Sequence, residues 1–207
     1  MQFFPRADKE LNHTSQEKRV KVKDLKVSKK YIAFYKPYGI LSQFTGEKPE
    51  ETLGAFNLPS EVYAAGRLDK DSEGLLLLTN DGALINNLAH PKAKTPKVYL
   101  VQVDGSPTQE SLKKMEKGLA IKNYITKPCF VKKVPEPNIP PRNPPIRVRK
   151  HIPTTWLEVT LFEGKNRQVR RMTAAIGHPT LRLIRTQISN IDLGTLRPGQ
   201  WKPCQKM

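Results

Sequence analysis

Residues 66–82 read Gly-Arg-Leu-Asp-Lys-Asp-Ser-Glu-Gly-Leu-Leu-Leu-Leu-Thr-Asn-Asp-Gly, and this stretch decides the fold. A glycine-arginine turn comes first and places one acid, Asp69, shortly before an uncharged run of leucines. Such a run predicts a buried strand, and the Asn-Asp-Gly that follows it contains the residues that end a strand in a turn. The stretch therefore predicts a carboxylate that is held rigidly at the rim of the hydrophobic core.

The chain around this stretch is strongly basic. Its 207 residues contain 36 Lys and Arg against 19 Asp and Glu, which gives a formal net charge of +17. This surplus predicts binding to a polyanion, with RNA or DNA favoured over anionic lipid because no basic amphipathic segment stands out. A hydrophobic content of 37% fits a globular protein that buries a core. In so cationic a chain, one rigidly held carboxylate indicates a residue with a role in function and not an ordinary surface acid.

The sequence gives no indication of a membrane span or a metal site. Its longest apolar run is far shorter than the ~20 residues that a transmembrane helix needs. The two cysteines, Cys129 and Cys204, have no histidines at zinc-site spacing and suggest neither a metal site nor a disulfide framework. We therefore expect a cytoplasmic protein with no membrane partner and no metal.

We divide the chain into a basic flexible tail, residues 1–28, and one folded domain, residues 29–207. Strands are expected at residues 31–35, 62–65, 75–79, 98–103, 156–162 and 180–185. Helices are expected at residues 51–56, 83–89, 108–117 and 166–176. Residues 135–153 are rich in proline and in basic side chains, which predicts a stiff cationic loop. This alternation favours a mixed or α+β domain over a doubly wound sheet.

Residues 163–172, Glu-Gly-Lys-Asn-Arg-Gln-Val-Arg-Arg-Met, are the second informative stretch. On a helix, Val169 and Met172 lie in an apolar stripe, and the three arginines of the stretch lie on the other side. From Lys165 to Arg185 there are six cationic residues and no acid. So many guanidiniums suit bidentate binding of phosphate or of a carboxylate partner. A solvated basic face is the alternative interpretation.

Together these motifs resemble the RsuA, RluB, RluE and RluF branch of the pseudouridine synthases. The resemblance rests on residues 66–82, on Lys-Val-Tyr-Leu-Val at 97–101 and on residues 163–172, in the family's order, and it covers about residues 30–200. It implies an α+β catalytic domain: a mixed, mostly antiparallel sheet flanked by helices, with a central active-site cleft and no S4 RNA-binding domain. One departure is Tyr35 before Lys36 and Pro37, where the family usually has asparagine.

The resemblance also implies a reaction and the residues that perform it. The reaction is isomerisation of a specific uridine to pseudouridine in ribosomal RNA, expected to be 23S rRNA, without a cofactor. A monomer is expected on other grounds, because the chain shows no spare apolar stripe for a partner. Asp69 matches the essential carboxylate, whose role as nucleophile or base stays open. Arg170 matches the active-site arginine and would pair with Asp69. Tyr99 matches the tyrosine that stacks on the extruded base, and Leu183 matches an apolar residue of the pocket wall.

The remaining basic residues are expected to grip the RNA backbone, with an affinity that falls steeply with salt. They are Arg67, Arg167 and Arg171, the loop residues Arg142, Arg147 and Arg149, and the downstream pair Arg182 and Arg185.

Residues taken singly leave other interpretations open. Asp69 could cap a turn, Tyr99 could be a core residue, and Arg170 could pair with a structural acid such as Glu163. Arg67 could bind RNA or brace its turn.

Three neighbouring acids, Asp71, Glu73 and Asp81, are expected to form turns or to face solvent. If a second acid worked beside Asp69, the protein would instead be a glycosidase or nucleoside hydrolase that uses paired carboxylates. A non-catalytic RNA-binding protein is the other alternative. The paired-carboxylate hydrolase is disfavoured because the sequence offers no second acid in an apolar setting. The non-catalytic RNA-binding protein would not explain why the chain carries the whole motif set.

Overall fold

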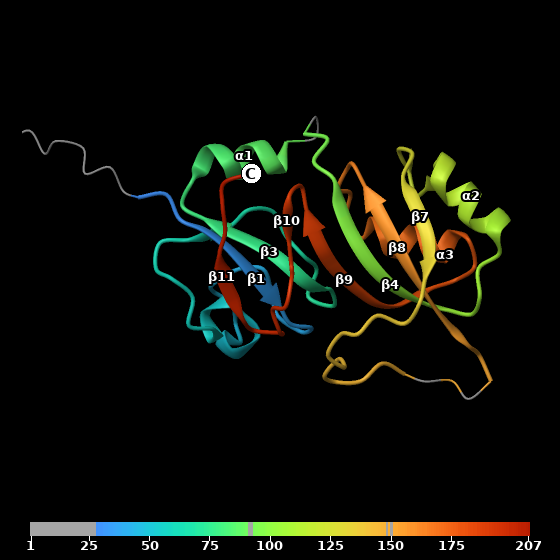
Figure 1. Ribbon diagram of the computed structural model, residues 1–207, viewed down its shortest axis with the longest axis horizontal. Coiled ribbons are helices and arrows are strands. Elements are labelled where there is room, and N and C mark those ends of the chain that lie inside the picture. Colours follow the sequence, from blue (N-terminus) through green and yellow to red (C-terminus); the bar gives the residue numbers. More distant parts are fainter. Residues whose placement is uncertain (1–27, 91–92, 148, 150) are drawn as a thin grey trace, which may run out of the picture.

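The computed structural model describes residues 28–90, 93–147, 149 and 151–207 (Figure 1). All but the last residue of the expected tail, residues 1–28, therefore lies outside the described part of the chain. The elements in chain order are β1 (Tyr31–Lys36), η1 (Pro49–Glu51), η2 (Leu53–Ala55), β2 (Tyr63–Ala64), β3 (Glu73–Thr79), α1 (Gly82–Ala89), β4 (Lys97–Asp104), α2 (Gln109–Lys117), β5 (Ala120–Ile121), β6 (Tyr124–Ile125), β7 (Phe130–Val134), β8 (Thr154–Leu161), α3 (Gln168–Ala175), β9 (Thr180–Ile188), β10 (Ile191–Asp192) and β11 (Trp201–Pro203).

One long mixed sheet organises the described residues. Its strands follow the order β11-β1-β3-β9-β4-β8-β7, with β2 also paired to β3 and β10 also paired to β9. Every pairing in it is antiparallel except that of β3 with β9. Helix α1 lies beside the half that contains β1 and β3, and α2 and α3 lie with the half that contains β4, β7 and β8 (Figure 1). The expected α+β fold with a mostly antiparallel sheet is confirmed.

The leucine run forms β3, and all seven of its residues are buried. Because side chains alternate along a strand, the four leucines divide between two cores. Leu75 and Leu77 pack in a cluster with residues of β9 and α1, whereas Leu76 and Leu78 pack against η2 and the segment before β2. A strand covered on both faces reads as a continuous apolar run, which is why this stretch could be assigned from the sequence.

The two halves of the sheet meet where β3 runs beside β9. Only two residue pairs join these strands in parallel, Glu73 with Ile184 and Gly74 with Arg185. Gly74 has a φ of +102°, and a Cβ built on it would lie 2.3 Å from the backbone oxygen of Arg185. The two backbones can approach this closely only because the residue is glycine.

Buried beside this junction is an ion pair that the sequence did not reveal. Glu73 accepts two hydrogen bonds of 2.8 Å from the guanidinium of Arg182, and both side chains are almost fully buried. Glu73 was expected to form a turn or face solvent and Arg182 was expected to bind RNA, and both expectations are wrong. A buried charge is tolerated when a partner and good hydrogen bonds compensate it, and here each residue provides that for the other.

Replacing Glu73 with glutamine should destabilise the protein by about 3 kcal/mol, because the guanidinium of Arg182 would stay buried without its counter-charge. Urea unfolding measures this free energy. The double variant Glu73→Gln/Arg182→Met, which removes both charges, should recover much of the loss. A single variant within about 0.5 kcal/mol of wild type would show that the pair is not desolvated as described.

Several boundaries differ from the expected ones for local reasons. Helix α3 begins at Gln168 and not at residue 166, because Arg167 has a left-handed backbone with a φ of 52°. In place of the helix expected at residues 51–56 there are two short 3₁₀ turns, at residues 49–51 and 53–55. Strand β7 was not expected, since its residues Phe-Val-Lys-Lys-Val are half polar; it is an edge strand with one buried and several exposed positions.

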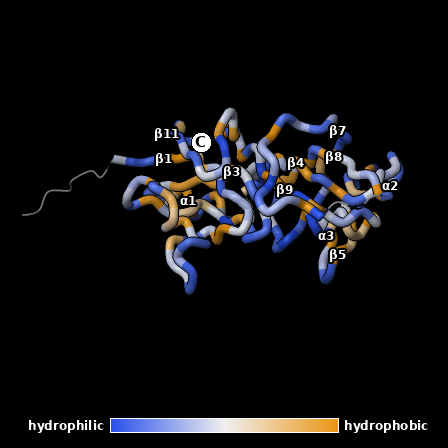
Figure 2. Tube along the Cα trace, turned by 90° about the horizontal axis from the view of Figure 1, so that it is seen from below, coloured by the Kyte–Doolittle hydropathy of each residue, from blue (hydrophilic) through white to orange (hydrophobic). Residues whose placement is uncertain are grey.

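The hydropathy of the chain follows this arrangement. The apolar stretches run through the strands and α1, and the loops at the periphery are mostly hydrophilic (Figure 2). Among the described residues, none of the helices has the length and apolar character that crossing a bilayer requires.

Candidate active site

Asp69 lies in the turn that enters β3, and hydrogen bonds fix the backbone on both sides of it. The hydroxyl of Ser42 donates to the carbonyl of Leu68 (2.8 Å) and accepts from its amide (3.0 Å). The amide of Gly39 donates to the carbonyl of Lys70 (2.8 Å), and the amide of Ser72 donates to the carbonyl of Asp69 (3.0 Å). The carboxylate is therefore held on a rigid turn, with about a third of its side chain exposed.

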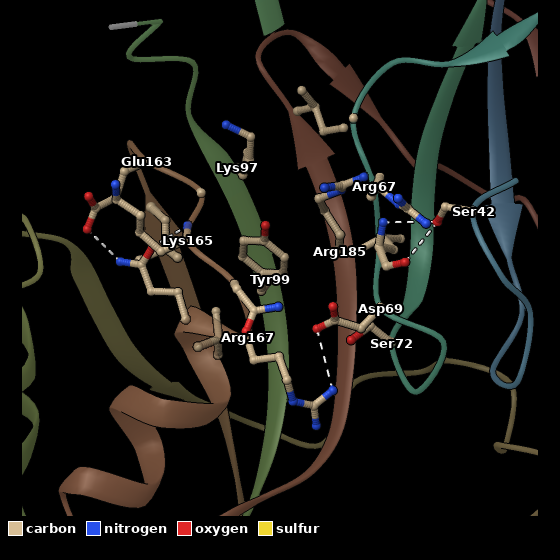
Figure 3. Close-up of a pocket in the computed structure, with 18 of the residues that line it drawn as sticks. Ser42, Arg67, Asp69, Ser72, Lys97, Tyr99, Glu163, Lys165, Arg167 and Arg185 are labelled. Atoms are coloured by element: carbon tan, nitrogen blue, oxygen red, sulfur yellow. Dashed lines mark hydrogen bonds and ion pairs between the residues drawn. The ribbon is translucent and has the colours of Figure 1, made fainter. Parts of the chain in front are cut away.

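A cavity of about 730 Å³ opens beside Asp69 at the centre of the sheet. Strands β4 and β9, the turn before β3 and the N-terminal end of α3 all contribute to its wall. Figure 3 shows Asp69 and Arg167 at one side of this space and Tyr99 on β4 facing it. A volume of this size is typical of a pocket for a small molecule or an extruded nucleotide.

Sheet register places the aromatic and apolar walls. Tyr99 pairs directly with Arg185 across β4 and β9, so both side chains lie on the same face, and Leu183 lies two residues earlier on that face. Tyr99 is 8% exposed and Leu183 is 6% exposed. Val169, on the first turn of α3, lines the same cavity. The structure therefore brings Asp69, Tyr99 and Leu183 together around one cavity, as the resemblance implied.

The arginines near Asp69 are arranged differently from expectation. The guanidinium of Arg167 donates two hydrogen bonds to the carboxylate of Asp71 (2.9 and 2.7 Å) and lies 3.7 Å from a carboxylate oxygen of Asp69. Arg170 donates to the backbone carbonyl of Asp71 (2.6 Å) and its Nε lies 3.4 Å from the Asp71 carboxylate. The ion pair of Asp69 is thus with Arg167, and Arg170 pairs with Asp71 and not with Asp69 or Glu163.

Asp71 is therefore not a merely solvent-facing acid, because it ties the turn that holds Asp69 to Arg167 and α3. Its partial burial acts to raise the pKa of its carboxyl, but the hydrogen bonds from Arg167 and the charge of Arg170 outweigh burial and hold the pKa below its usual value. For Arg170 burial is the largest effect, and it lowers the pKa of the guanidinium despite the nearby Asp71. With both arginines bound to Asp71, the ion pair of Asp69 among the described residues is its 3.7 Å contact with Arg167.

We expect the Asp71→Asn variant to change the pH dependence of stability. Because the pKa of Asp71 is lowered by folding, its ionised form stabilises the protein above the pKa of the unfolded side chain, and this contribution disappears as the pH falls through the lower folded pKa. The difference in free energy of unfolding between wild type and Asp71→Asn should therefore be constant above about pH 5 and shrink below about pH 4. Urea unfolding across this range measures it. A difference that does not depend on pH would contradict the ion pairs described for Asp71.

The residues expected to contact RNA lie in several different parts of the structure. Arg67 and Arg167 line the cavity. Arg67 also donates to the side chain of Gln43 (3.1 Å), so it braces its turn as well as facing the pocket. Arg171 lies outside the cavity wall, half-buried on α3, and donates to Asn166 (2.5 Å).

None of the described residues of the basic loop, 135–153, belongs to the cavity wall. Arg142 stacks 4.2 Å from the ring centre of Tyr38 and donates to the carbonyls of Pro144 and Pro145, so it holds the loop's shape. Arg149 pairs with Asp104 (3.0 Å). Arg147 is exposed. Two of the three loop arginines are thus already engaged within the protein.

Arg182 and Arg185 are buried and not exposed as expected. Arg182 pairs with Glu73 away from the cavity, whereas Arg185 lines it. Lys97 lines it too and was not singled out from the sequence as a site residue. Its spacing of two residues from Tyr99 was the available signal, because residues i and i+2 of a strand share a face.

No cluster of three or more histidine, cysteine, aspartate or glutamate side chains that could hold a metal ion occurs in the described part of the chain. The groups that line this cavity are two carboxylates, Asp69 and Glu163, an aromatic ring, apolar walls and several cations. The Glu163 carboxylate accepts hydrogen bonds from the side chain of Gln168 (2.6 Å) and the amide of Lys127 (2.9 Å).

Comparison with known proteins gives a consistent result. The model of the RNA pseudouridylate synthase family matches residues 30–175. A protein of Vibrio parahaemolyticus named ribosomal large subunit pseudouridine synthase E is 54% identical over 178 residues, which are 86% of this chain and 75% of that protein. Ribosomal large subunit pseudouridine synthase B of Bacillus subtilis is 37% identical, over 87% of this chain and 71% of that protein. A crystal structure of a pseudouridylate synthase superposes with a TM-score of 0.70 at 26% identity, over 86% of this chain and 71% of that one.

Proposed function

This chain belongs to the RNA pseudouridylate synthase family, and on that basis we propose that it converts one uridine of the large-subunit ribosomal RNA to pseudouridine. In this reaction the bond from N1 of uracil to C1′ of ribose breaks, a bond from C5 to C1′ forms, and a proton leaves C5 while N1 gains one. The product has the same mass as the substrate. The proteins with synthase E in their names, about 52–54% identical, support the choice of large-subunit RNA.

One observation carries the proposal: a rigidly held carboxylate stands at the rim of a cavity that has an aromatic side chain and apolar walls. A base-paired uridine cannot present C1′ and C5 to a side chain, so it must be extruded, at a cost of a few kcal/mol. The cavity of about 730 Å³ offers room for the extruded nucleotide. In our proposal Tyr99 stacks on the uracil, and Leu183 and Val169 close the other walls.

Asp69 would act on the ribose or the base of the extruded nucleotide. Attack as a nucleophile and removal of a proton as a base both require its ionised form. Arg167 lies 3.7 Å from the Asp69 carboxylate without occupying both of its oxygens, because the hydrogen bonds of Arg167 go to Asp71. Arg170 contributes by holding the backbone of Asp71, two residues from Asp69.

The net charge of +17 provides the remaining affinity. Arg67 and Arg167 at the cavity and Arg147 and Arg171 outside it would contact the RNA backbone, so binding should weaken steeply as salt rises. We further propose that the protein acts in the cytoplasm as a monomer and without a cofactor.

Incubation of the purified protein with a 23S rRNA transcript tests the reaction. Pseudouridine keeps its carbodiimide adduct through alkaline treatment and stops reverse transcriptase, so a new stop at one position is expected, with no release of free uracil. Release of uracil would identify a nucleoside hydrolase instead. RNA binding with neither product would favour a non-catalytic RNA-binding protein.

A further inference from the structure

Two cations of the cavity, Lys97 and Arg185, are at least partly buried and have no acidic partner among the described residues, whereas the unpaired Arg67, Lys127 and Lys165 of its wall are exposed. Lys97 on β4 and Arg185 on β9 both line the pocket, and neither forms an ion pair with any carboxylate of the described residues. Figure 3 shows them reaching the pocket from neighbouring strands, beside Tyr99. Of the other pocket cations, Arg167 pairs with Asp71 and Lys70 pairs with Glu51.

Arg185 is buried without compensation for its charge. It is 4% exposed, and its Nε donates to the carbonyl of Leu75 (2.8 Å), but its buried Nη2 has no hydrogen-bond partner. Arg182 on the same strand is equally buried and has Glu73 as a counter-charge. An unsatisfied buried donor on a charged group costs at least about 1–3 kcal/mol. Such a group is an exception that calls for a ligand or another explanation.

Lys97 shares this environment. Its Nζ donates a hydrogen bond to the carbonyl of Thr95 (3.1 Å). Burial lowers the pKa of its ammonium, and the charge of Arg185 lowers it further. Two partly desolvated cations that repel each other raise the free energy of the folded protein, and an anion bound between them would lower it.

We propose that Lys97 and Arg185 bind a backbone phosphate adjacent to the target uridine, an inference that rests on the proposed function. Tyr99 lies directly opposite Arg185 and two residues from Lys97, a spacing of about 7 Å along a strand. This is the scale of one nucleotide, so a base stacked on Tyr99 would bring a phosphate to the two cations. A phosphodiester carries a full negative charge and has two oxygens that can accept from both cations, whereas a uracil carbonyl carries no net charge.

Calorimetric titration with uridine and with uridine 3′,5′-bisphosphate tests this subsite without requiring activity. The variant is Lys97→Met, which keeps the length of the side chain, and Lys97→Arg is its conservative counterpart. Lys113→Met, at an exposed position on α2, is the matched control for loss of one positive charge. Uridine 3′-monophosphate and uridine 5′-monophosphate, each titrated alone, distinguish which phosphate is bound.

Wild type and Lys113→Met should bind the bisphosphate at least about tenfold more tightly than uridine, Lys97→Met should lose that advantage, and Lys97→Arg should keep most of it. Lys97→Met should also unfold at the same or a higher temperature than wild type, because it relieves repulsion, whereas a merely structural lysine would lower the melting temperature when removed. Equal affinities of wild type for uridine and bisphosphate, or an equal advantage in wild type and Lys97→Met, would overturn the subsite. The proposed function fails separately, if wild type binds these ligands but forms no pseudouridine in rRNA.

Discussion

Asp69→Asn is expected to lower the rate of pseudouridine formation by on the order of 10³-fold or more, with little change in RNA affinity. Asparagine has the shape of aspartate but cannot act as a base or as a carboxylate nucleophile, and such groups contribute about 10²–10⁴-fold each. The hydrogen bonds that hold the turn come from Ser42, Gly39 and Ser72, and none uses the Asp69 side chain. Single-turnover kinetics on the rRNA transcript, with binding measured by fluorescence anisotropy, separates rate from affinity.

Asp192→Asn is the matched control, because it removes an exposed carboxylate that does not line the cavity. It should react like wild type. If Asp69→Asn kept its activity within about tenfold of the control, Asp69 would not be the reacting group. If it instead lost RNA binding, its role would be in recognition.

Gly74→Ala should damage both stability and catalysis. A positive φ on a residue other than glycine costs about 1–3 kcal/mol, and overpacking against the Arg185 backbone costs about 1–3 kcal/mol more. A methyl group 2.3 Å from a backbone oxygen cannot be accommodated, so β3 must move away from β9. Asp69 lies on the turn that leads into β3, and Tyr99 on β4 pairs with Arg185 of β9. Movement of β3 away from β9 therefore also separates the two sides of the cavity. A displacement of about 1 Å in an active site can cost roughly 10²-fold in rate.

Gly82→Ala is the control for this prediction. Gly82 begins α1 without a positive φ, and a Cβ there meets nothing within 4 Å. Alanine should be neutral or slightly stabilising at that position. Urea unfolding and the rate on the transcript should both distinguish the two variants. If Gly74→Ala behaved like Gly82→Ala, the close approach of β3 and β9 would be wrong.

The elements that could be predicted from sequence are those with a strong local signal. The leucine run predicted β3 because a strand that is buried on both faces has a continuous apolar sequence. Helix α2 was bounded to within one residue, because Thr108 caps its start and Gly118 its end. In the site, the meeting of Asp69 and Tyr99 at one cavity was predicted from residues 66–82 and 97–101, but only because these motifs resemble those of a known family. Charge and periodicity by themselves indicated no more than a structured protein that binds a polyanion.

What sequence reasoning missed depends on contacts between distant segments. Asp71 and Arg167 are 96 residues apart, and Glu73 and Arg182 are 109 apart, so no local spacing reveals either pair. The arginines of β9 looked like an exposed basic row, because a buried charge is indistinguishable from a solvated one until its partner is placed. Lys36 is another cation whose burial the sequence did not reveal: its side chain is fully buried, and burial lowers the pKa of its ammonium to about 7.

Mapping of pseudouridines in ribosomal RNA from cells that lack this protein tests the central claim most directly. Carbodiimide treatment followed by reverse transcription reads every pseudouridine of the large-subunit RNA as a stop. The proposed function predicts that one stop disappears in these cells, returns when wild-type protein is supplied, and stays absent when Asp69→Asn is supplied. An unchanged set of stops in the cells without the protein, or restoration of the missing stop by Asp69→Asn, would contradict it.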